Sequence, residues 1–380
     1  MAGGRHLRRV ESWVAALAAV ALLAGCGAKT DLWTPDADED RPCYPQPLAL
    51  LTIPPEVVFL VDRSGSMNWA LTSDNPALPG ELSRWQLLEQ ALAEVLAETD
   101  PTMLQVGAKF FPNRPAWVPG TVEPDPCQVV PGLDLEPAPR MFDRLLSFFH
   151  TTRPVGGTPT ADGLEEVRVR FAGRSGEGGP RFVVLATDGG PNCNPHPEVP
   201  PPECVCTGMS YMCDPRPVPD GAGEETATRN CLDEARTLDQ IELIFGSHGV
   251  PVFVIGIFNP SRPELLAVLD RMAIAGGRPR ADDGGRRFYN VREPADLRDA
   301  LDSITSTILR CVFRVYPAGP EDPTTVRVTI DGREIRHDHL RDDGWDFTNE
   351  ARTELTLFGS ACEEMRVEER EPAAVAECPE

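Results

Sequence analysis

Basic residues are scarce in this 380-residue chain, which has 36 Lys and Arg against 59 Asp and Glu and a formal net charge of −23. Such a chain repels nucleic acid, so nucleic acid is excluded as a partner, and the charge favours solubility. Long apolar runs are also missing, since no stretch after residue 24 approaches the about 18 apolar residues of a membrane-spanning helix. The chain has no internal repeat of about 20–50 residues.

The short apolar run near the N-terminus has the features of an export signal. Three arginines precede the run Val14–Ala24, which is too short to span a bilayer comfortably. The run ends in Leu23-Ala24-Gly25-Cys26, which resembles the bacterial lipobox, in which the cysteine is lipidated and becomes the first mature residue. We expect residues 1–25 to be a lipoprotein signal peptide, although an ordinary signal peptide with a chance cysteine is the alternative. Gly27 gives no inner-membrane retention signal, so we expect an exported protein on the outer membrane, facing the periplasm or the outside, with the lipid as its only membrane attachment.

The cysteine count supports export. The chain has 11 cysteines, and lipidation of Cys26 leaves an even number that disulfides can pair in an oxidising compartment. The disulfide candidates are Cys43, Cys127, Cys193, Cys204, Cys206, Cys213, Cys231, Cys311, Cys362 and Cys378. Zinc is the competing interpretation for the cluster 193–231, but its C-x-C pair differs from the C-x-x-C of common zinc folds, so we expect disulfides mostly within the cluster. For Cys311 we expect a bridge to Cys362, with Cys43–Cys311 as the rival.

Composition and periodicity divide the rest of the chain. Residues 26–52 are polar and Pro-rich, which is typical of a linker. Strands and helices alternate over residues 53–311, which predicts a Rossmann-like, doubly wound, mainly parallel α/β sheet with helices on both faces. A Cys- and Pro-rich insertion occupies residues 189–223. Short alternating strands over residues 312–380 predict a small β module.

The elements are expected at the following positions. Apolar runs predict buried strands at 57–61, 104–111, 181–187 and 251–258, and a short strand at 287–291. Helical spacing predicts helices at 85–97, 141–150, 161–171, 226–246, 263–275 and 295–309. Residues 112–140 are expected to be a loop with a short edge strand near 128–130. The β module is expected to have strands at 313–316, 325–330 and 354–357.

Three polar motifs follow or precede these elements. Asp62-Arg63-Ser64-Gly65-Ser66 ends the first buried strand, Gly156-Gly157-Thr158-Pro159-Thr160 precedes a helix, and Ala186-Thr187-Asp188-Gly189 ends another strand. Ligands of open parallel sheets bind at the carboxyl ends of strands, so these motifs can form one site. Their carboxylates and hydroxyls are hard oxygen donors, which suit Mg²⁺ or Mn²⁺, and Ca²⁺ less strictly. The absence of His and Cys from the motifs argues against zinc.

In this order and on these elements, the three motifs resemble the metal-ion-dependent adhesion site of von Willebrand factor type A and integrin inserted domains. The resemblance covers roughly residues 53–310. It implies five metal-site residues: Asp62, Ser64, Ser66, Thr158 and Asp188. The three hydroxyl residues would be direct ligands, the two aspartates would act partly through water, and an exposed Asp or Glu of a partner protein would complete the coordination. The expected function is a metal-dependent protein-binding or adhesion module, and not an enzyme.

Two other functions stay open. A metal-assisted hydrolase needs a general base beside the metal, for which His150 and His196 are the candidates, although each is more simply a solvated loop residue. Ser64 also lacks the G-x-S-x-G elbow. The other alternative is a disulfide-held structural protein of the envelope, in which the metal only orders the loops. The insertion 189–223 follows Asp188 directly, so we expect it to border the metal site, either shaping a ligand surface or covering part of it.

Overall fold

The computed structural model describes residues 44–52, 54–113, 123–172, 179–208, 210–216, 223–257, 263–280, 285–367 and 370–378. The expected signal peptide, the expected lipidation site Cys26 and the disulfide candidate Cys43 lie outside these ranges. Within them, none of the helices has the length and apolar character needed to cross a membrane.

A six-stranded, mostly parallel sheet forms the centre of an α/β domain, in the strand order β4-β3-β2-β5-β6-β7. The strands are β2 (Glu56–Asp62), β3 (Gln105–Phe111), β4 (Leu135–Ala138), β5 (Arg181–Thr187), β6 (Val252–Ile257) and β7 (Tyr289–Val291). All neighbouring pairs are parallel except β3 and β4. The chain builds outward from β2 in one direction to β3 and in the other to β5, so β2 and β5 flank the point where the strand order reverses.

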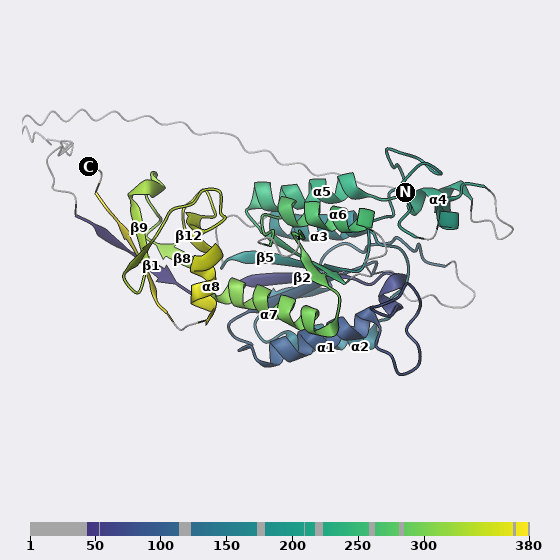
Figure 1. Cartoon of the computed structure of the whole chain (residues 1–380), viewed down its shortest axis with the longest axis horizontal. Coiled ribbons are helices and arrows are strands. Elements are labelled where there is room, and N and C mark those ends of the chain that lie inside the picture. The colour runs from purple at the N-terminus through teal and green to yellow at the C-terminus, as the bar shows by residue number, and fades with distance from the viewer. Residues whose placement is uncertain are drawn as a thin grey trace, which may run out of the picture. The chain divides into compact units, whose positions relative to one another are not determined.

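Helices cover both faces of this sheet, as the alternating pattern predicts (Figure 1). One face packs against α1 (Arg84–Ala97), α2 (Phe142–Thr151) and α7 (Pro294–Arg310). The other packs against α3 (Thr160–Ala172), α5 (Glu234–Glu242) and α6 (Pro263–Ala275). Successive side chains of β2 alternate between the two cores, with Phe59 on the first side and Leu60 on the second. Because both faces are covered, β2 is buried along its whole length, which explains its continuous apolar sequence.

A second, antiparallel sheet has seven strands in the order β10-β9-β13-β1-β8-β12-β11. Its strands are β1 (Gln46–Leu51), β8 (Val312–Tyr316), β9 (Val326–Ile330), β10 (Arg333–Ile335), β11 (Gly344–Phe347), β12 (Glu354–Phe358) and β13 (Pro372–Ala376). Helix α8 (Gly359–Val367) lies between β12 and β13 in the chain. The fully buried Trp345 lies in its core with Leu48 and the bridge Cys311–Cys362.

The prediction that residues 26–52 form a linker is wrong for residues 46–51. These residues form β1, whose first half pairs with β13 and whose second half pairs with β8. Leu48 is the side chain of β1 that is buried in the core of the antiparallel sheet. The α/β domain is therefore inserted between two adjacent strands, β1 and β8, of the antiparallel sheet.

The expected edge strand near residues 128–130 is also wrong, because β4 lies at Leu135–Ala138 instead. The reason is a buried amine on β3. The ammonium of Lys109 donates to the carbonyls of Val130 and Gly132, the latter at 2.7 Å, and lies 3.9 Å from a carboxylate oxygen of Asp134. Burial lowers the pKa of Lys109, and the charge of Asp134 opposes that shift. Of the two carbonyls that accept from this amine, that of Val130 lies in the segment expected to be the strand, and that of Gly132 lies two residues after it.

The helix expected at 226–246 is interrupted. It consists of α4 (Glu224–Arg229), then α5, then a π-helical turn at Leu243–Ser247. Between α4 and α5, Cys231 is fully buried and bonded to Cys204, and the backbone of Cys231 forms a bridge with Cys206. Tethering of this segment to the insertion breaks the helix, and periodicity alone gives no sign of it.

Four disulfides are defined among the described residues: Cys127–Cys193, Cys204–Cys231, Cys206–Cys213 and Cys311–Cys362. Cys378 is also disulfide-bonded. The Cys311–Cys362 prediction is confirmed, and so is pairing within the insertion cluster for two bridges, whereas Cys193 pairs outside the cluster.

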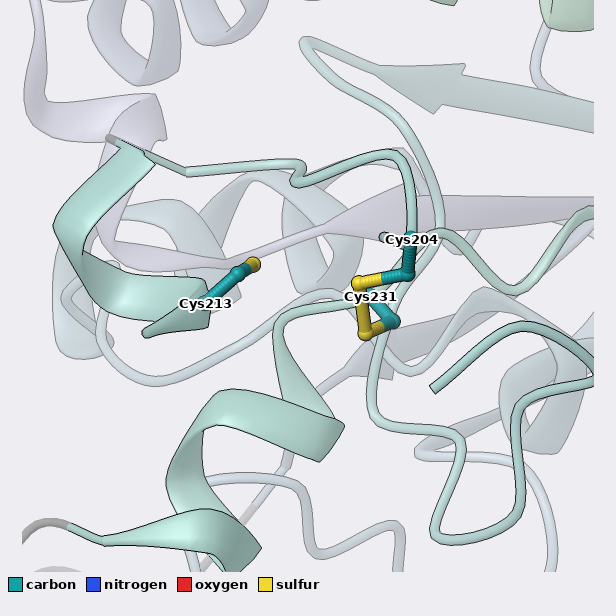
Figure 2. Close-up of side chains that lie close together, drawn as sticks. All are labelled: Cys204, Cys213 and Cys231. Carbon is teal, nitrogen blue, oxygen red and sulfur yellow. A yellow bond between two sulfur atoms is a disulfide. The ribbon is translucent and has the colours of Figure 1, made fainter. Parts of the chain in front are cut away.

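Figure 2 shows the Cys204–Cys231 bond with the sulfur of Cys213 nearby, and the three sulfur atoms lie within 4.8 Å of one another. Zinc binds thiolates, so sulfurs held in disulfides favour the disulfide interpretation of this cluster.

Candidate metal site

The end of β2 presents a hydrogen-bonded group of oxygens. The Oδ1 atom of Asp62 accepts the backbone N–H of Ser64 at 2.7 Å, which folds the motif into a tight turn. The hydroxyl oxygens of Ser64 and Ser66 lie 3.0 Å apart, and the Ser66 hydroxyl donates to Oδ1 of Asp188 at 2.8 Å. We call Asp62, Ser64, Ser66 and Asp188 the oxygen cluster. It joins the carboxyl ends of β2 and β5, at the reversal of strand order, where the sequence predicts a ligand site.

A loop that precedes α3 lies against this turn. The carbonyl of Gly156 accepts the N–H of Gly65 at 3.0 Å, and the N–H of Val155 donates to the carbonyl of Arg63 at 2.8 Å. We call residues 156–158 the threonine loop. Its third residue, Thr158, is buried. These backbone contacts place the fifth expected residue on a segment bonded directly to the D-x-S-x-S turn.

Both glycines of the threonine loop are required by their surroundings. Gly156 has a φ of +94°, and a Cβ there would lie 2.4 Å from the carbonyl oxygen of Pro126. At Gly157, a Cβ would lie 2.6 Å from Sγ of Cys193 and 3.4 Å from Sγ of Cys127. The disulfide between these two cysteines therefore packs directly on the loop that carries Thr158.

Asn192, in the insertion, holds Thr158 on both sides of its backbone. Its Oδ1 accepts the Thr158 N–H at 2.6 Å, and its own N–H donates to the Thr158 carbonyl at 2.9 Å. Its Nδ2 donates to the hydroxyl of Thr207 at 2.8 Å. The insertion therefore contacts the expected site residue Thr158 and supports the threonine loop. Sequence reasoning missed Asn192 because its partner is distant in the chain.

Arg84 is the second residue that sequence reasoning missed. It is the first residue of α1, after the capping box of Ser83 and Gln86, and its side chain is 2% exposed. Its Nη1 donates to Oδ2 of Asp188 at 2.7 Å, so Asp188 accepts from Arg84 with one oxygen and from Ser66 with the other. The sequence gives only a weak signal of this role. An arginine at the start of a helix lies at the positive end of the helix dipole, where cations are disfavoured.

The two carboxylates of the cluster are difficult to ionise together. Burial raises the pKa of Asp62 to about 7, and the nearby charge of Asp188 contributes to the same shift. Burial also raises the pKa of Asp188, which the charge and hydrogen bond of Arg84 oppose. A divalent cation would relieve both penalties, and carboxylate and hydroxyl oxygens are its preferred ligands. The residues present therefore fit the ion that the sequence resemblance implies.

The two histidines considered for hydrolysis have other surroundings. The Nδ1 atom of His150 lies 2.6 Å from a carboxylate oxygen of Glu89 on α1, and the His150 side chain is 68% exposed. His196 is exposed in the insertion, where its N–H donates to Asn194. Neither observation gives a base poised at the oxygen cluster.

No protein-family model matches this chain, and no curated protein sequence matches it. Among solved structures it is similar to the PilB minor pilin from Streptococcus sanguinis, with 17% identity, a TM-score of 0.43 and coverage of 68% of this chain and 62% of the pilin. This chain thus spans less than two thirds of that pilin. It is also similar to the vWF domain of the type V pili tip protein Mfa5 from Porphyromonas gingivalis, with 14% identity, a TM-score of 0.41 and coverage of 68% and 96%. A third similar structure is the manganese-loaded TRAP protein of Plasmodium vivax, with 14% identity, a TM-score of 0.40 and coverage of 78% and 91%.

Proposed function

We propose that residues 53–311 form a von Willebrand factor A-type module that binds Mg²⁺ or Mn²⁺ and, through the ion, an exposed Asp or Glu of a partner protein. The observation that carries the proposal is the hydrogen-bonded oxygen cluster at the point where the strand order reverses, together with the hydrogen bond from Gly65, in the same turn, to the threonine loop. Ca²⁺ is a less favoured alternative, because its larger shell prefers more carboxylates than this site offers.

Each side chain has a distinct part in the proposed site. The hydroxyls of Ser64, Ser66 and Thr158 would be direct ligands, as the resemblance implies. Both carboxylates would act partly through water, since both oxygens of each already accept hydrogen bonds. Asp62 accepts from the Ser64 N–H at 2.7 Å and the Thr187 hydroxyl at 2.6 Å, and Asp188 accepts from the Ser66 hydroxyl at 2.8 Å and Arg84 at 2.7 Å. With neutral hydroxyls as the main direct ligands, a bound ion keeps enough positive charge to attract a carboxylate. That attraction matters because the chain's net charge of −23 otherwise repels an acidic partner.

Export and membrane anchoring are part of the same proposal. The lipobox-like sequence ending at Cys26 supports a lipid anchor on the outer membrane, and the four defined disulfides support an oxidising compartment. Dual or triple acylation would hold the protein more stably than one chain.

Titration calorimetry with Mg²⁺ and Mn²⁺ on the oxidised protein tests the metal site. Asp62→Ala and Thr158→Ala should abolish or strongly weaken binding. Thr160→Ala is the matched control, because the Thr160 side chain contacts the Thr158 carbonyl at 3.4 Å and is not an expected ligand. Absence of heat with either ion in the wild type would refute the site.

Crosslinking in intact cells, with and without chelation, tests the partner. We expect crosslinked proteins that disappear on chelation and in Asp62→Ala. Capture that survives both treatments would show that binding does not use the metal site, and turnover of a substrate lost in Asp62→Ala would favour a hydrolase instead.

A further inference from the structure

We propose that the buried positive charge of Arg84 makes metal binding at the oxygen cluster depend on the partner's carboxylate. The inference rests on the proposed function and concerns how the same site is regulated. Its basis is the buried contact between Arg84 and Asp188, whose side chains are 2% and 0% exposed.

The guanidinium of Arg84 is fixed in place by its other contacts. Nε donates to the carbonyl of Ala70 at 3.2 Å, and Nη2 donates to the carbonyl of Ser73 at 3.1 Å. The guanidinium carbon also lies 5.7 Å from the ring centroid of Trp69. All three neighbours belong to the segment that follows the D-x-S-x-S motif. The charge therefore stays beside Asp188 and cannot swing into solvent without breaking buried hydrogen bonds.

The charges at the site follow from these contacts. When a bound divalent ion keeps both Asp62 and Asp188 ionised, the ion, the two carboxylates and Arg84 together carry one net positive charge. A single carboxylate from outside then brings the site to zero. Asp74 also contacts Arg84, at 3.3 Å, but its side chain is 44% exposed, so water screens much of its charge.

Two consequences follow for binding. Buried net charge is unfavourable, so the ion alone should bind more weakly than it would without Arg84. An added carboxylate should tighten ion binding, and by thermodynamic linkage the ion should tighten carboxylate binding by the same factor. Arg84 would thus reduce occupation of the site by the ion when no acidic partner is present.

The test is calorimetric titration of Mn²⁺ into the full oxidised chain, in chloride and in acetate at equal ionic strength, with acetate as a minimal carboxylate probe. For the wild type we expect tighter Mn²⁺ binding in acetate. Arg84→Gln should bind Mn²⁺ in chloride about tenfold or more tightly than the wild type, with a smaller effect of acetate. Arg84→Lys, which keeps the charge, should behave as the wild type.

Arg298→Gln is the matched control, because Arg298 pairs with Glu98 at the opposite end of α1 and is about half exposed. It removes the same charge and should leave both titrations unchanged. Folding of each variant is checked by circular dichroism and thermal melting.

Three results would overturn the inference. The first is folded Arg84→Gln that binds Mn²⁺ no more tightly than the wild type, which would leave Arg84 only a positioning role toward Asp188. The second is an Mn²⁺ affinity that is the same in acetate and in chloride, both for the wild type and for Arg84→Lys. This result would decide the matter even if Arg84→Gln failed to fold. The third, no Mn²⁺ binding by the wild type in either salt, would refute the proposed metal site itself and is thereby distinguished from the other two.

Discussion

Removing the disulfide Cys127–Cys193 should weaken both the fold and the proposed metal site. In the chain-entropy description, a bridge across 66 residues stabilises the folded state by about 4 kcal/mol. The bridge also packs on Gly157, next to Thr158. Without the bridge, ion binding would have to order the threonine loop. Fixing one residue costs about 1–2 kcal/mol of conformational free energy, which corresponds to about a tenfold loss of metal affinity.

We therefore expect the double variant Cys127→Ala/Cys193→Ala to have a lower free energy of unfolding, measured by chemical denaturation. We also expect it to bind Mn²⁺ more weakly, measured by calorimetry under conditions where the protein is folded. Cys311→Ala/Cys362→Ala is a closely matched control. That bridge spans 51 residues, so the same description gives about 4 kcal/mol of stability, but it lies in the core of the antiparallel sheet. The control should lose stability and keep its metal affinity. Equal metal affinities in both double variants would show that the disulfide does not position the threonine loop.

Three further predictions concern single residues. Gly157→Ala should cost about 1–3 kcal/mol and weaken Mn²⁺ binding, because its Cβ would meet Sγ of Cys193 at 2.6 Å; unchanged denaturation and calorimetry would count against this packing. Burial raises the pKa of Asp233 to about 6, against the attraction of Arg236, so the folded state binds the extra proton between about pH 4 and 6. Stability should therefore rise in the wild type relative to Asp233→Asn as the pH falls from 7 to 5, and parallel pH profiles by denaturation would contradict that assignment. Mass spectrometry of the mature protein should find an acylated Cys26, and an unmodified chain that starts elsewhere would exclude the lipid anchor.

The parts of the site that could be predicted from the sequence are those encoded locally. Parallel strands in the middle of a covered sheet are apolar throughout, so β2 and β5 are visible as runs, and the residues that follow them are fixed by chain connectivity. The oxygen cluster needs only those two strand ends to be neighbours. Their adjacency follows from a doubly wound order, which the alternation of strands and helices indicates.

The parts that could not be predicted depend on contacts between distant residues. Arg84 and Asp188 are 104 residues apart, and the sequence around Arg84 does not indicate its partner. Asn192 holds Thr158 across 34 residues. Strand β1 pairs with strands from the other end of the chain, and its side chains are mostly exposed, so it carries too little periodic signal to be separated from the preceding polar segment. Each miss comes from tertiary pairing and not from local propensity.

The insertion of the α/β domain between β1 and β8 has a mechanical consequence. The chain enters the domain after β1 and leaves it into β8, and these two strands are hydrogen-bonded antiparallel neighbours. The oxygen cluster lies at the other end of β2 from this entry point. If a partner pulled at the cluster while the segment before β1 was tethered, the tension would run through the backbone from β1 directly into β2. The antiparallel sheet would then lie beside the load path, and its hydrogen bonds would not have to carry the force between the tether and the cluster.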